Sequence, residues 1–256
     1  MKKQFYRILY IAVLLIITFH TTLQGQPAIG EWRAHVSYNY IIDVDGSENT
    51  IYAASNTGIQ VYYKNSNTVE AMSTVNGLSD VDINIIRYIP QVSALFIGYS
   101  NGNIDVLKDN EIDNYPEIMN STYQDDRRVY DFIYHNNKVL IACGFGIVEF
   151  NPSTGQFKDT YYIEEGEIIS INDLAKDGQY MYAATAKGVY YASHSGSLMN
   201  PENWERITTL PNAQQKFDKI SLFNGHILVN YSNATGNDEV YVVDNRSYTQ
   251  TLISNM

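Results

Sequence analysis

Short apolar runs separated by polar turns dominate the chain after about residue 40, and one pairing of runs recurs. In LFIGYSNGNIDVL (95–107), an Asn-Gly pair between two apolar runs predicts a hairpin with a type I′ turn, in which both central residues have positive φ. Similar segments begin at Ile51 (IYAASNTGIQVYY), Val139 (VLIACGFGIVEF) and Met181 (MYAATAKGVYYAS). A looser fifth copy with a longer turn begins at Ile227. The pattern therefore predicts five β-hairpins.

Glycines mark the turns of the first four hairpins at nearly constant spacing. Gly58, Gly102, Gly146 and Gly188 lie 44, 44 and 42 residues apart, and the fifth hairpin begins 46 residues after the fourth. We interpret these glycines as structural turn residues and not as markers of a site. A repeat of this length indicates a chain built from copies of one supersecondary unit.

Each hairpin is preceded by a further apolar run and followed by a weaker one. The preceding runs are YIIDV (40–44), INIIRYI (83–89), VYDFIYH (129–135), IISINDLA (168–175) and FDKISLF (217–223). The turns after them carry pairs such as Asp45-Gly46, and the weaker runs include DTYYI (159–163) and WERITTL (204–210). Four short strands in about 44 residues are typical of a β-propeller blade, which buries its faces by stacking on neighbours. The alternative, an array of immunoglobulin-like sandwiches, has units of roughly 100 residues.

We therefore predict an all-β chain, a β-propeller of four-stranded blades with about five repeats of 42–46 residues. The segment EWRAHVSY (31–38) has the pattern of an outer strand. Closure of a propeller usually needs a strand from one terminus to complete the blade that the other terminus builds. We expect residues 26–256 to be an incomplete larger propeller, the N-terminal part of a longer protein.

The first 25 residues have a different pattern. Lys2, Lys3 and Arg7 precede an apolar run from Ile8 to Phe19, and small polar residues follow. This order predicts a signal peptide over residues 1–25, cleaved between Gly25 and Gln26. A membrane anchor is the alternative, but about a dozen apolar residues fall short of the roughly 20 that span a bilayer. We expect an exported chain, in the periplasm or at the outer-membrane cell surface.

Charge and cysteine usage narrow the possible partners. The chain has 17 basic and 28 acidic residues, a net charge of −11 that becomes −14 when the first 25 residues are removed. Such a field repels nucleic acid and anionic surfaces in general. Cys143, the single cysteine, lies in the apolar run VLIACG, so we expect a buried small hydrophobe without a disulfide.

The sequence contains few candidate metal-binding or catalytic residues. DVDGSEN (43–49) lacks the ligand spacing of an EF-hand and is interpreted as a turn. The histidines have no metal-ligand spacing, and Glu164, Glu165 and Glu167 are expected on a solvated loop and not as a catalytic acid and base. Phosphate-binding loops, the sialidase aspartate box and the nucleophile elbow are absent from the sequence. We predict no catalytic residue, no metal site and no cofactor, and a rigid binding surface whose residues stay unassigned.

Several segments resemble known propellers. STVNGLSDVDINIIRYI (73–89) resembles the blades of exported two-component-regulator propellers of Bacteroidetes-type bacteria. EWRAHVSYN, NGLSD, GYSNGNIDVL, ACGFGIVEFN and YAATAKGVYYAS resemble, in the same order, the N-terminal propeller of the PorZ-like family of the type IX secretion system. The GNID and GFGIV runs are more specific than a generic blade.

The resemblance implies a non-catalytic role. Members of this family have two propellers and a β-sandwich sorting domain, and they act in an outer-membrane attachment complex with a sortase and an outer-membrane barrel protein. They support cargo maturation and deliver anionic lipopolysaccharide to the sortase. The acidic charge of this chain suggests that a glycan site lies elsewhere. Two alternatives remain: a periplasmic sensor propeller of a two-component histidine kinase, which the sequence after Met256 would distinguish, and a propeller hydrolase or lyase.

Overall fold

Strands make up nearly all of the regular structure. The computed structural model describes residues 39–122, 126–232 and 238–254, which all belong to one unit. These residues form five four-stranded antiparallel sheets and one 3₁₀ turn, η1 (Pro201–Asn203). The predicted signal peptide, its Gly25–Gln26 cleavage point and the segment 31–38 lie outside the described residues. Within the described ranges, no helix has the length and apolarity needed to cross a membrane.

Each sheet consists of four strands that are consecutive in the chain and paired in chain order. The first sheet contains β1 (Asp43–Gly46), β2 (Thr50–Ser55), β3 (Gly58–Tyr63) and β4 (Thr68–Met72). The second contains β5 (Ile83–Ile89), β6 (Ala94–Tyr99), β7 (Ile104–Lys108) and β8 (Glu111–Tyr115). The third contains β9 (Val129–His135), β10 (Lys138–Cys143), β11 (Gly146–Asn151) and β12 (Gln156–Tyr161). The fourth contains β13 (Ile171–Lys176), β14 (Tyr180–Thr185), β15 (Gly188–Ser193) and β16 (Trp204–Arg206). The fifth contains β17 (Lys219–Phe223), β18 (His226–Ser232), β19 (Asp238–Asp244) and β20 (Ser247–Ser254).

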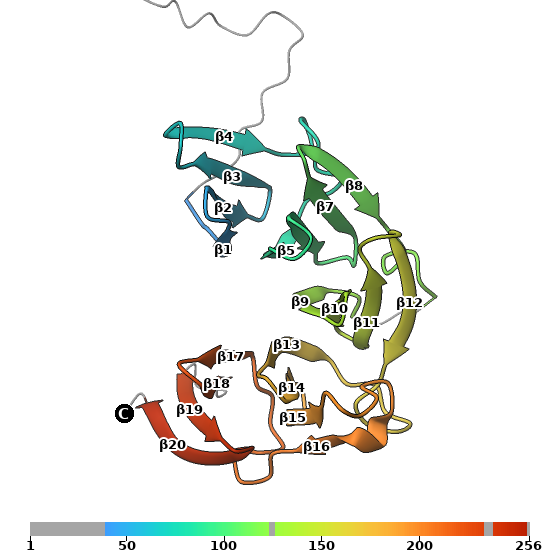
Figure 1. Cartoon of the computed structure of the whole chain (residues 1–256), viewed down its shortest axis with the longest axis vertical. Helices are drawn as coiled ribbons and strands as arrows, with labels where there is room; N and C mark the ends of the chain where they lie inside the picture. Colours follow the sequence, from blue (N-terminus) through green and yellow to red (C-terminus); the bar gives the residue numbers. More distant parts are fainter. Residues whose placement is uncertain (1–38, 123–125, 233–237, 255–256) are drawn as a thin grey trace, which may run out of the picture. The chain divides into compact units, whose positions relative to one another are not determined.

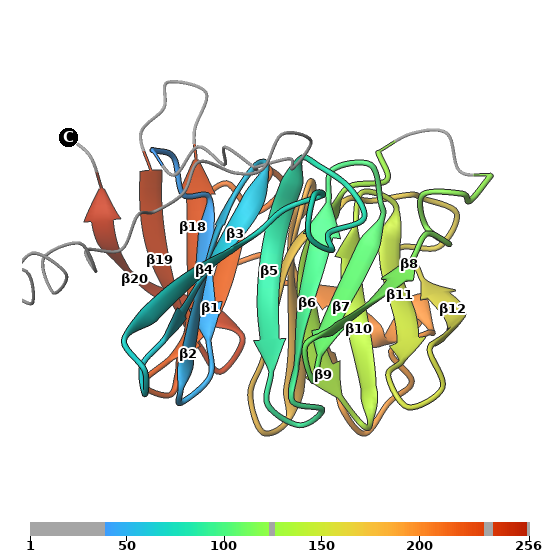
Figure 2. The ribbon, with the colours of Figure 1, turned by 90° about the horizontal axis from the view of Figure 1, so that it is seen from above.

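Consecutive sheets are neighbours through their first strands, since β1 contacts β5, β5 contacts β9, β9 contacts β13, and β13 contacts β17. Figure 1 shows these strands on the inner side of the unit and the fourth strands, such as β8 and β12, on the outer side. In Figure 2 most strands lie along a common axis, up or down, whereas β4 and β8 cross it obliquely, and the turns gather at two opposite ends. These are the features of propeller blades, and they confirm the predicted fold class. Among the described residues, no strand pairing joins the first and fifth sheets.

The core consists of four apolar clusters, each between two consecutive sheets. Burial of the second strands follows this arrangement: every residue of β6 is buried, whereas burial alternates in β18 of the fifth sheet. β6 is covered on both faces, and Leu95, Phe96 and Ile97 each contribute about 1.5–3 kcal/mol relative to an exposed position. Cys143 is free and fully buried in the cluster between the second and third sheets, which confirms its prediction as a small core residue.

The predicted hairpin at 95–107 forms, but its turn type was wrong. Gly98 pairs with Ile104, and within the intervening turn only Gly102 has positive φ, at 90°. The Asn101 side chain accepts the N–H of Asn103 at 2.9 Å, in addition to backbone bonds from Gly102 to Tyr99 and from Tyr99 to Asn103. A Cβ at position 102 would lie 2.9 Å from the carbonyl oxygen of Arg127, so the turn requires glycine.

Paired positive φ values occur instead between the first and second strands. Asn136 and Asn137 have φ of 49° and 61°, and Asn224 and Gly225 have 54° and 86°. His135 pairs with Lys138 around the first of these turns. These Asn-Asn and Asn-Gly pairs are therefore two-residue turns. Asp109-Asn110 and Asn245-Arg246, each between a third and a fourth strand, have the same paired positive φ values.

Two further local predictions were wrong. Asp45-Gly46 does not form the first turn, because β1 extends to Gly46 and the turn follows it. Asp45 accepts the N–H of Tyr88 from β5 at 2.8 Å, which holds it in an extended strand. The predicted fourth strand at 204–210 ends at Arg206.

Candidate functional site

One position recurs at the same register on each first strand. Strand register makes Asp43, Ile85, Asp131, Asp173 and Lys219 equivalent, since each pairs with the same position of the adjacent second strand. The partners are Ala54, Gly98, Ala142, Ala184 and Asn230. Four of these five equivalent residues are polar, although they lie on inner strands of the fold.

Three of these side chains bond to the backbone of the following sheet. Asp43 accepts the N–H of Ile86 at 3.0 Å, and Asp173 accepts that of Ile220 at 2.9 Å. Asp131 accepts the N–H of Leu174 at 3.3 Å. Donor and acceptor are 43 to 47 residues apart in each case, about one repeat. These carboxylates connect consecutive sheets by satisfying backbone donors of the inner strands.

Asparagines at strand irregularities make the complementary contact. The register shifts next to Asn84 in β5 and next to Asn172 in β13. The Asn84 Nδ2 atom donates to the carbonyl of Val129 at 2.7 Å, and that of Asn172 donates to the carbonyl of Phe217 at 2.7 Å. The bulges aim these amides at the next sheet. We call Asp43, Asp45, Asn84, Arg87, Asp131, Asn172 and Asp173 the inner-strand network.

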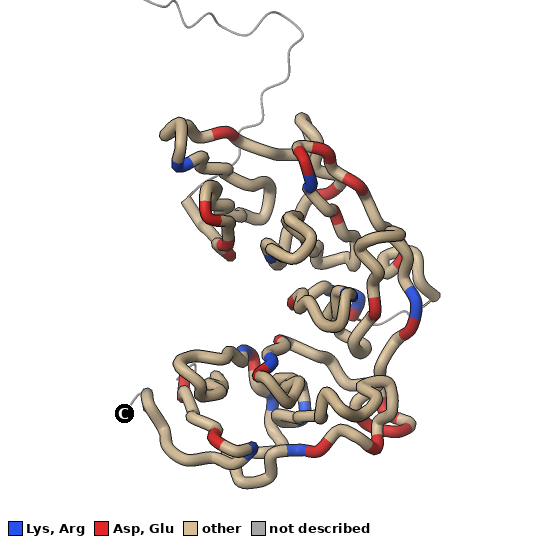
Figure 3. Tube along the Cα trace, in the orientation of Figure 1, with Lys and Arg blue, Asp and Glu red and all other residues tan. Residues whose placement is uncertain are grey.

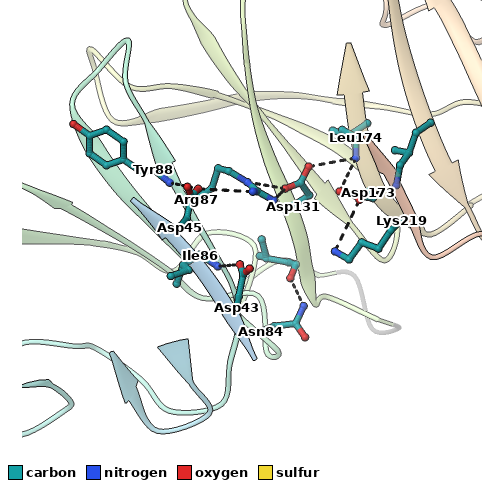
Figure 4. Close-up of polar contacts among 12 residues, drawn as sticks. Asp43, Asp45, Asn84, Ile86, Arg87, Tyr88, Asp131, Asp173, Leu174 and Lys219 are labelled. Carbon is teal, nitrogen blue, oxygen red and sulfur yellow. Dashed lines mark hydrogen bonds and ion pairs between the residues drawn. The ribbon is translucent and has the colours of Figure 1, made fainter. Parts of the chain in front are cut away.

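Arg87 of β5 lies at the centre of this network (Figure 4). Its Nη2 atom is 2.7 Å from Asp131 Oδ1, and its Nη1 atom is 3.7 Å from Asp45 Oδ2. Burial opposes the charged guanidinium, but Asp131, followed by Asp45 and Asp43, outweighs it and raises the pKa of Arg87. Arg87 thereby connects the first, second and third sheets.

Asp131 and Asp173 converge on one donor. The N–H of Leu174 points at Asp131 Oδ2 and also at Asp173 Oδ1, at 3.3 and 3.1 Å. Lys219 Nζ approaches Asp173 Oδ2 only to 4.0 Å. Burial, and then the charge of Asp131, raises the pKa of Asp173 to about 8. The fourth sheet therefore carries a carboxyl group that favours its protonated form at neutral pH.

A cavity of about 670 Å³ lies beside these groups. Its polar lining includes Asp131, Asp173, Lys176 and Lys219, and its apolar lining includes Leu228 and Val240 of the fifth sheet. The acidic side chains at this cavity are used in contacts with neighbouring strands. Its lining therefore mixes charged and apolar side chains.

A second polar cluster connects two segments that carry the family resemblance, NGLSD (76–80) and GNID (102–105). Asp105 is completely buried, and its Oδ2 atom accepts the N–H of Ser79 at 2.8 Å and the hydroxyl of Tyr99 at 2.6 Å. The Asn114 Nδ2 atom donates to Asp105 Oδ1 and to Asn103 Oδ1, both at 2.9 Å. By strand register, Ile104 corresponds to Ile59, Ile147 and Val189. Asn103 therefore lies at the end of the turn, and its side chain completes a buried hydrogen-bond network.

This cluster fixes the loop between β4 and β5, residues 73–82, which we call the 73–82 loop. Leu78 is buried in the first apolar cluster, and Asn101 Nδ2 donates to Asp80 Oδ2 at 2.6 Å. Val75 and Val81 remain 53% and 50% exposed on the same loop. A loop held by a buried carboxylate thus presents apolar side chains to solvent.

The four glycines predicted as turn residues lie in turns or at the first position of a strand. Gly58, Gly146 and Gly188 are the first residues of β3, β11 and β15, and each pairs with the last residue of the preceding strand. Gly102 lies in the turn before β7.

The structure brings together two histidines that are far apart in sequence. The rings of His135 and His194, from the third and fourth sheets, have centroids 4.6 Å apart. Burial, and then the charge of His194, lowers the pKa of His135 to about 4. Nowhere in the described ranges do three or more His, Cys, Asp or Glu side chains gather so that they could hold a metal ion.

The glutamates of the 164–167 loop are bound to neighbouring side chains. Glu164 accepts from Arg206 at 2.6 Å and from the Tyr190 hydroxyl, and Glu167 pairs with Lys187. Glu164 and Glu167 therefore each have a cationic partner.

Sequence reasoning missed the inner-strand network and the cluster around Asp105. The signal available was weak: an aspartate recurs at one place in three of the five first strands, but its partner is about one repeat away. The four turn glycines, by contrast, were visible because each lies next to its own hairpin.

Comparisons with known proteins give one family. The profile described as "TSS9, PorZ, N-terminal beta-propeller domain" matches residues 51–205, from β2 to β16. No curated protein matches this chain.

Solved structures show the same fold at low identity. The chain is similar to PorZ of Porphyromonas gingivalis, an essential surface component of the type IX secretion system, with a TM-score of 0.68 and 19% identity. The match covers 84% of this chain but 28% of that protein. The extracellular domains of two putative regulators from B. thetaiotaomicron, BT4673 and BT3049, match with TM-scores of 0.56 and 0.54. Identities are 16% and 14%; the matches cover 82% and 83% of this chain and 27% and 34% of those domains.

Proposed function

Because this chain belongs to the family of PorZ N-terminal β-propeller domains, we propose that it is a non-catalytic, exported binding component of the type IX secretion system. In this proposal it acts as a scaffold in the outer-membrane attachment complex and supports sortase-dependent maturation of cargo. The observation that carries the proposal is the family match over residues 51–205, which spans most of four of the five sheets. The solved relative with the highest TM-score quoted above is a surface component of this system.

The 73–82 loop is the docking surface that we assign to a protein partner. Loops carried on a rigid scaffold are the usual binding elements of such folds. Here Asp105 and Asn101 hold the loop, so Val75 and Val81 are displayed in fixed positions and little ordering entropy is lost on binding. The partners in this proposal are the sortase and the outer-membrane barrel proteins of the complex.

Anionic lipopolysaccharide fits this part of the protein less well than a protein partner does. Acidic residues outnumber basic ones, 28 to 17, and Lys and Arg are dispersed over the sheets (Figure 3). Arg87 and Arg206 are paired with carboxylates. Delivery of the polysaccharide, if this protein takes part, therefore uses a site outside these five sheets.

Co-purification with the sortase tests the docking surface. The tagged full chain is expressed in the bacterium, and the sortase and barrel proteins are detected by immunoblot in the detergent-extracted complex. The double variant Val75→Asp, Val81→Asp is expected to lose about tenfold or more of the co-purified sortase, since it places charge in an apolar contact. The matched control is Val69→Asp on β4, which is 60% exposed and lies outside the loop. Equal recovery with all variants would exclude the loop as the docking surface.

Export requires the N-terminal segment to function as a signal peptide. We propose cleavage between Gly25 and Gln26, so that the mature chain begins at Gln26. N-terminal sequencing of protein from the periplasmic and surface fractions tests this, and a retained Met1 in those fractions would contradict it.

A sensor function is the second candidate, favoured by the similarity to the extracellular domains of two-component regulators. In that case the propeller binds a periplasmic ligand and signals to a histidine kinase. Sequencing the gene beyond codon 256 separates the two candidates. Further blades and a sorting domain would support secretion, whereas a membrane helix and a kinase domain would support the sensor.

A further inference from the structure

Two carboxyl groups from adjacent inner strands lie where the third, fourth and fifth sheets meet. Asp131 extends from β9 and Asp173 from β13, and both are directed at the N–H of Leu174 (Figure 4). Two ionised carboxylates that share one donor repel each other. A proton held between them converts the repulsion into a hydrogen bond.

The neighbouring cations do not neutralise both carboxylates. Arg87 from β5 is 2.7 Å from Asp131 and is itself close to Asp45 and Asp43 of β1, so its charge is shared. From β17, Lys219 is 4.0 Å from Asp173, with its side chain 58% exposed. On β13, Lys176 lines the same cavity but donates to the carbonyl of Tyr134. Two acidic groups with side chains 3% and 8% exposed therefore face one close cation and one distant one.

We propose that Asp131 and Asp173 share one proton and form a proton-dependent latch between the third, fourth and fifth sheets. With the proton present, Asp131 remains bound to Arg87 and Leu174, and Asp173 remains bound to Ile220. When the proton leaves, the two carboxylates repel, and Asp173 moves toward Lys219 and the cavity. The contacts of β13 with β9 and β17 then weaken.

Carbon-13 NMR of the full chain labelled at aspartate carboxyls tests the shared proton directly. One resonance is expected to titrate near pH 8, far above the usual range for aspartate of about 4. Asp173→Asn should remove this resonance, and its amide can donate to Asp131 in place of the proton. Asp131→Asn should move the titration down by about two pH units or more, because it removes the like charge. The matched control is Asp218→Asn, a residue that pairs with Lys216 outside the inner strands and should leave the resonance unchanged.

Amide hydrogen exchange tests the latch. Above the titration midpoint, protection of the Leu174 and Ile220 amides should fall about tenfold in the wild type relative to Asp173→Asn at the same pH. The absence of any aspartate that titrates above pH 6 would overturn the proposal. So would a high-pH resonance that persists unchanged in both Asp131→Asn and Asp173→Asn, or a titration without change in protection of these amides.

Discussion

Ser79 donates its backbone N–H to Oδ2 of Asp105 at 2.8 Å, across 26 residues of chain. This bond connects the loop that leaves the first sheet to a completely buried carboxylate in the second. The same carboxylate accepts the Tyr99 hydroxyl and the Asn114 amide. The carboxyl group of Asp105 therefore fixes a surface loop and stabilises the core at the same time.

Replacing Asp105 should destabilise the protein and release the loop. Asp105→Ala leaves the Ser79 N–H and the Tyr99 hydroxyl without their acceptor and removes one acceptor of the Asn114 amide. We therefore expect the free energy of unfolding to fall by about 3–5 kcal/mol. Asp105→Asn keeps the shape and one acceptor and should lose about 1–2 kcal/mol. Urea denaturation measures both values. Asp113→Asn, an exposed carboxylate in β8 of the same sheet, is the control and should change stability by less than about 0.5 kcal/mol. An unchanged Asp105→Ala protein would contradict this role.

Removing the Arg87 side-chain charge should leave Asp131 without its cation. For Arg87→Met we expect a loss of about 2–4 kcal/mol, the lower part of the range for breaking a buried ion pair, because Arg87 is partly exposed. Lys216→Met breaks an exposed pair with Asp218 and should cost at most about 1 kcal/mol. Chemical denaturation of both variants gives the comparison, and equal effects would show that Arg87 has no special part in joining the sheets.

Stability should fall as pH rises from about 7 to 8. Asp173 keeps its proton up to about pH 8 in the folded chain, whereas an unfolded aspartate loses it near pH 3.9. The folded chain therefore binds more protons in this window, and the free energy of unfolding decreases with a slope of at most about 1.4 kcal/mol per pH unit. The pKa values of Glu149, Glu164 and Asp177 are lowered, so these groups finish titrating below the window. The pKa values of His135 and His194 are also lowered, so these histidines raise stability with pH, but only up to about pH 7, since an unfolded histidine loses its proton near pH 6.5. Urea denaturation across the range should show this slope in the wild type and not in Asp173→Asn. A wild type whose stability is constant or rises would contradict it.

Cys143 should be unreactive in the folded protein. Its thiol is fully buried, and burial, with a smaller effect of Asp126, raises its pKa. Labelling with a thiol reagent should be at least about 100-fold slower in the native protein than in urea, because it requires opening of the cluster between the second and third sheets. Similar labelling rates in both conditions would show that this cluster is not closed.

Strand bounds, which depend on neighbouring residues, could be predicted from the sequence. Contacts between residues of different repeats could not. The runs 83–89 and 129–135 are the exact bounds of β5 and β9, because apolar residues and flanking turns delimit them. The pair Asp45-Gly46 is typical of turns, but a bond to Tyr88 of the next sheet keeps it in a strand. Asn101-Gly102 does not form a two-residue turn because the turn between Gly98 and Ile104 is longer, and the Asn101 side chain is bound to Asp80 and to the N–H of Asn103.

The inner-strand network could not be predicted from the sequence either, because it also depends on contacts between repeats. Whether Asp131 lies on a solvated strand or against Leu174 is decided by sheet packing about one repeat away. Once the fold aligns the first strands, the equivalence of Asp43, Asp131 and Asp173 is evident from register alone.

The most direct measurement of the central proposal, participation in type IX secretion, is cargo processing in a strain that lacks this gene. Sorting signals of surface-anchored cargo should remain uncleaved in the deletion strain, and the full-length gene should restore cleavage. A gene copy carrying Val75→Asp and Val81→Asp should fail to restore it, while one carrying Val69→Asp should succeed. Normal cargo maturation in the deletion strain would contradict the proposed function.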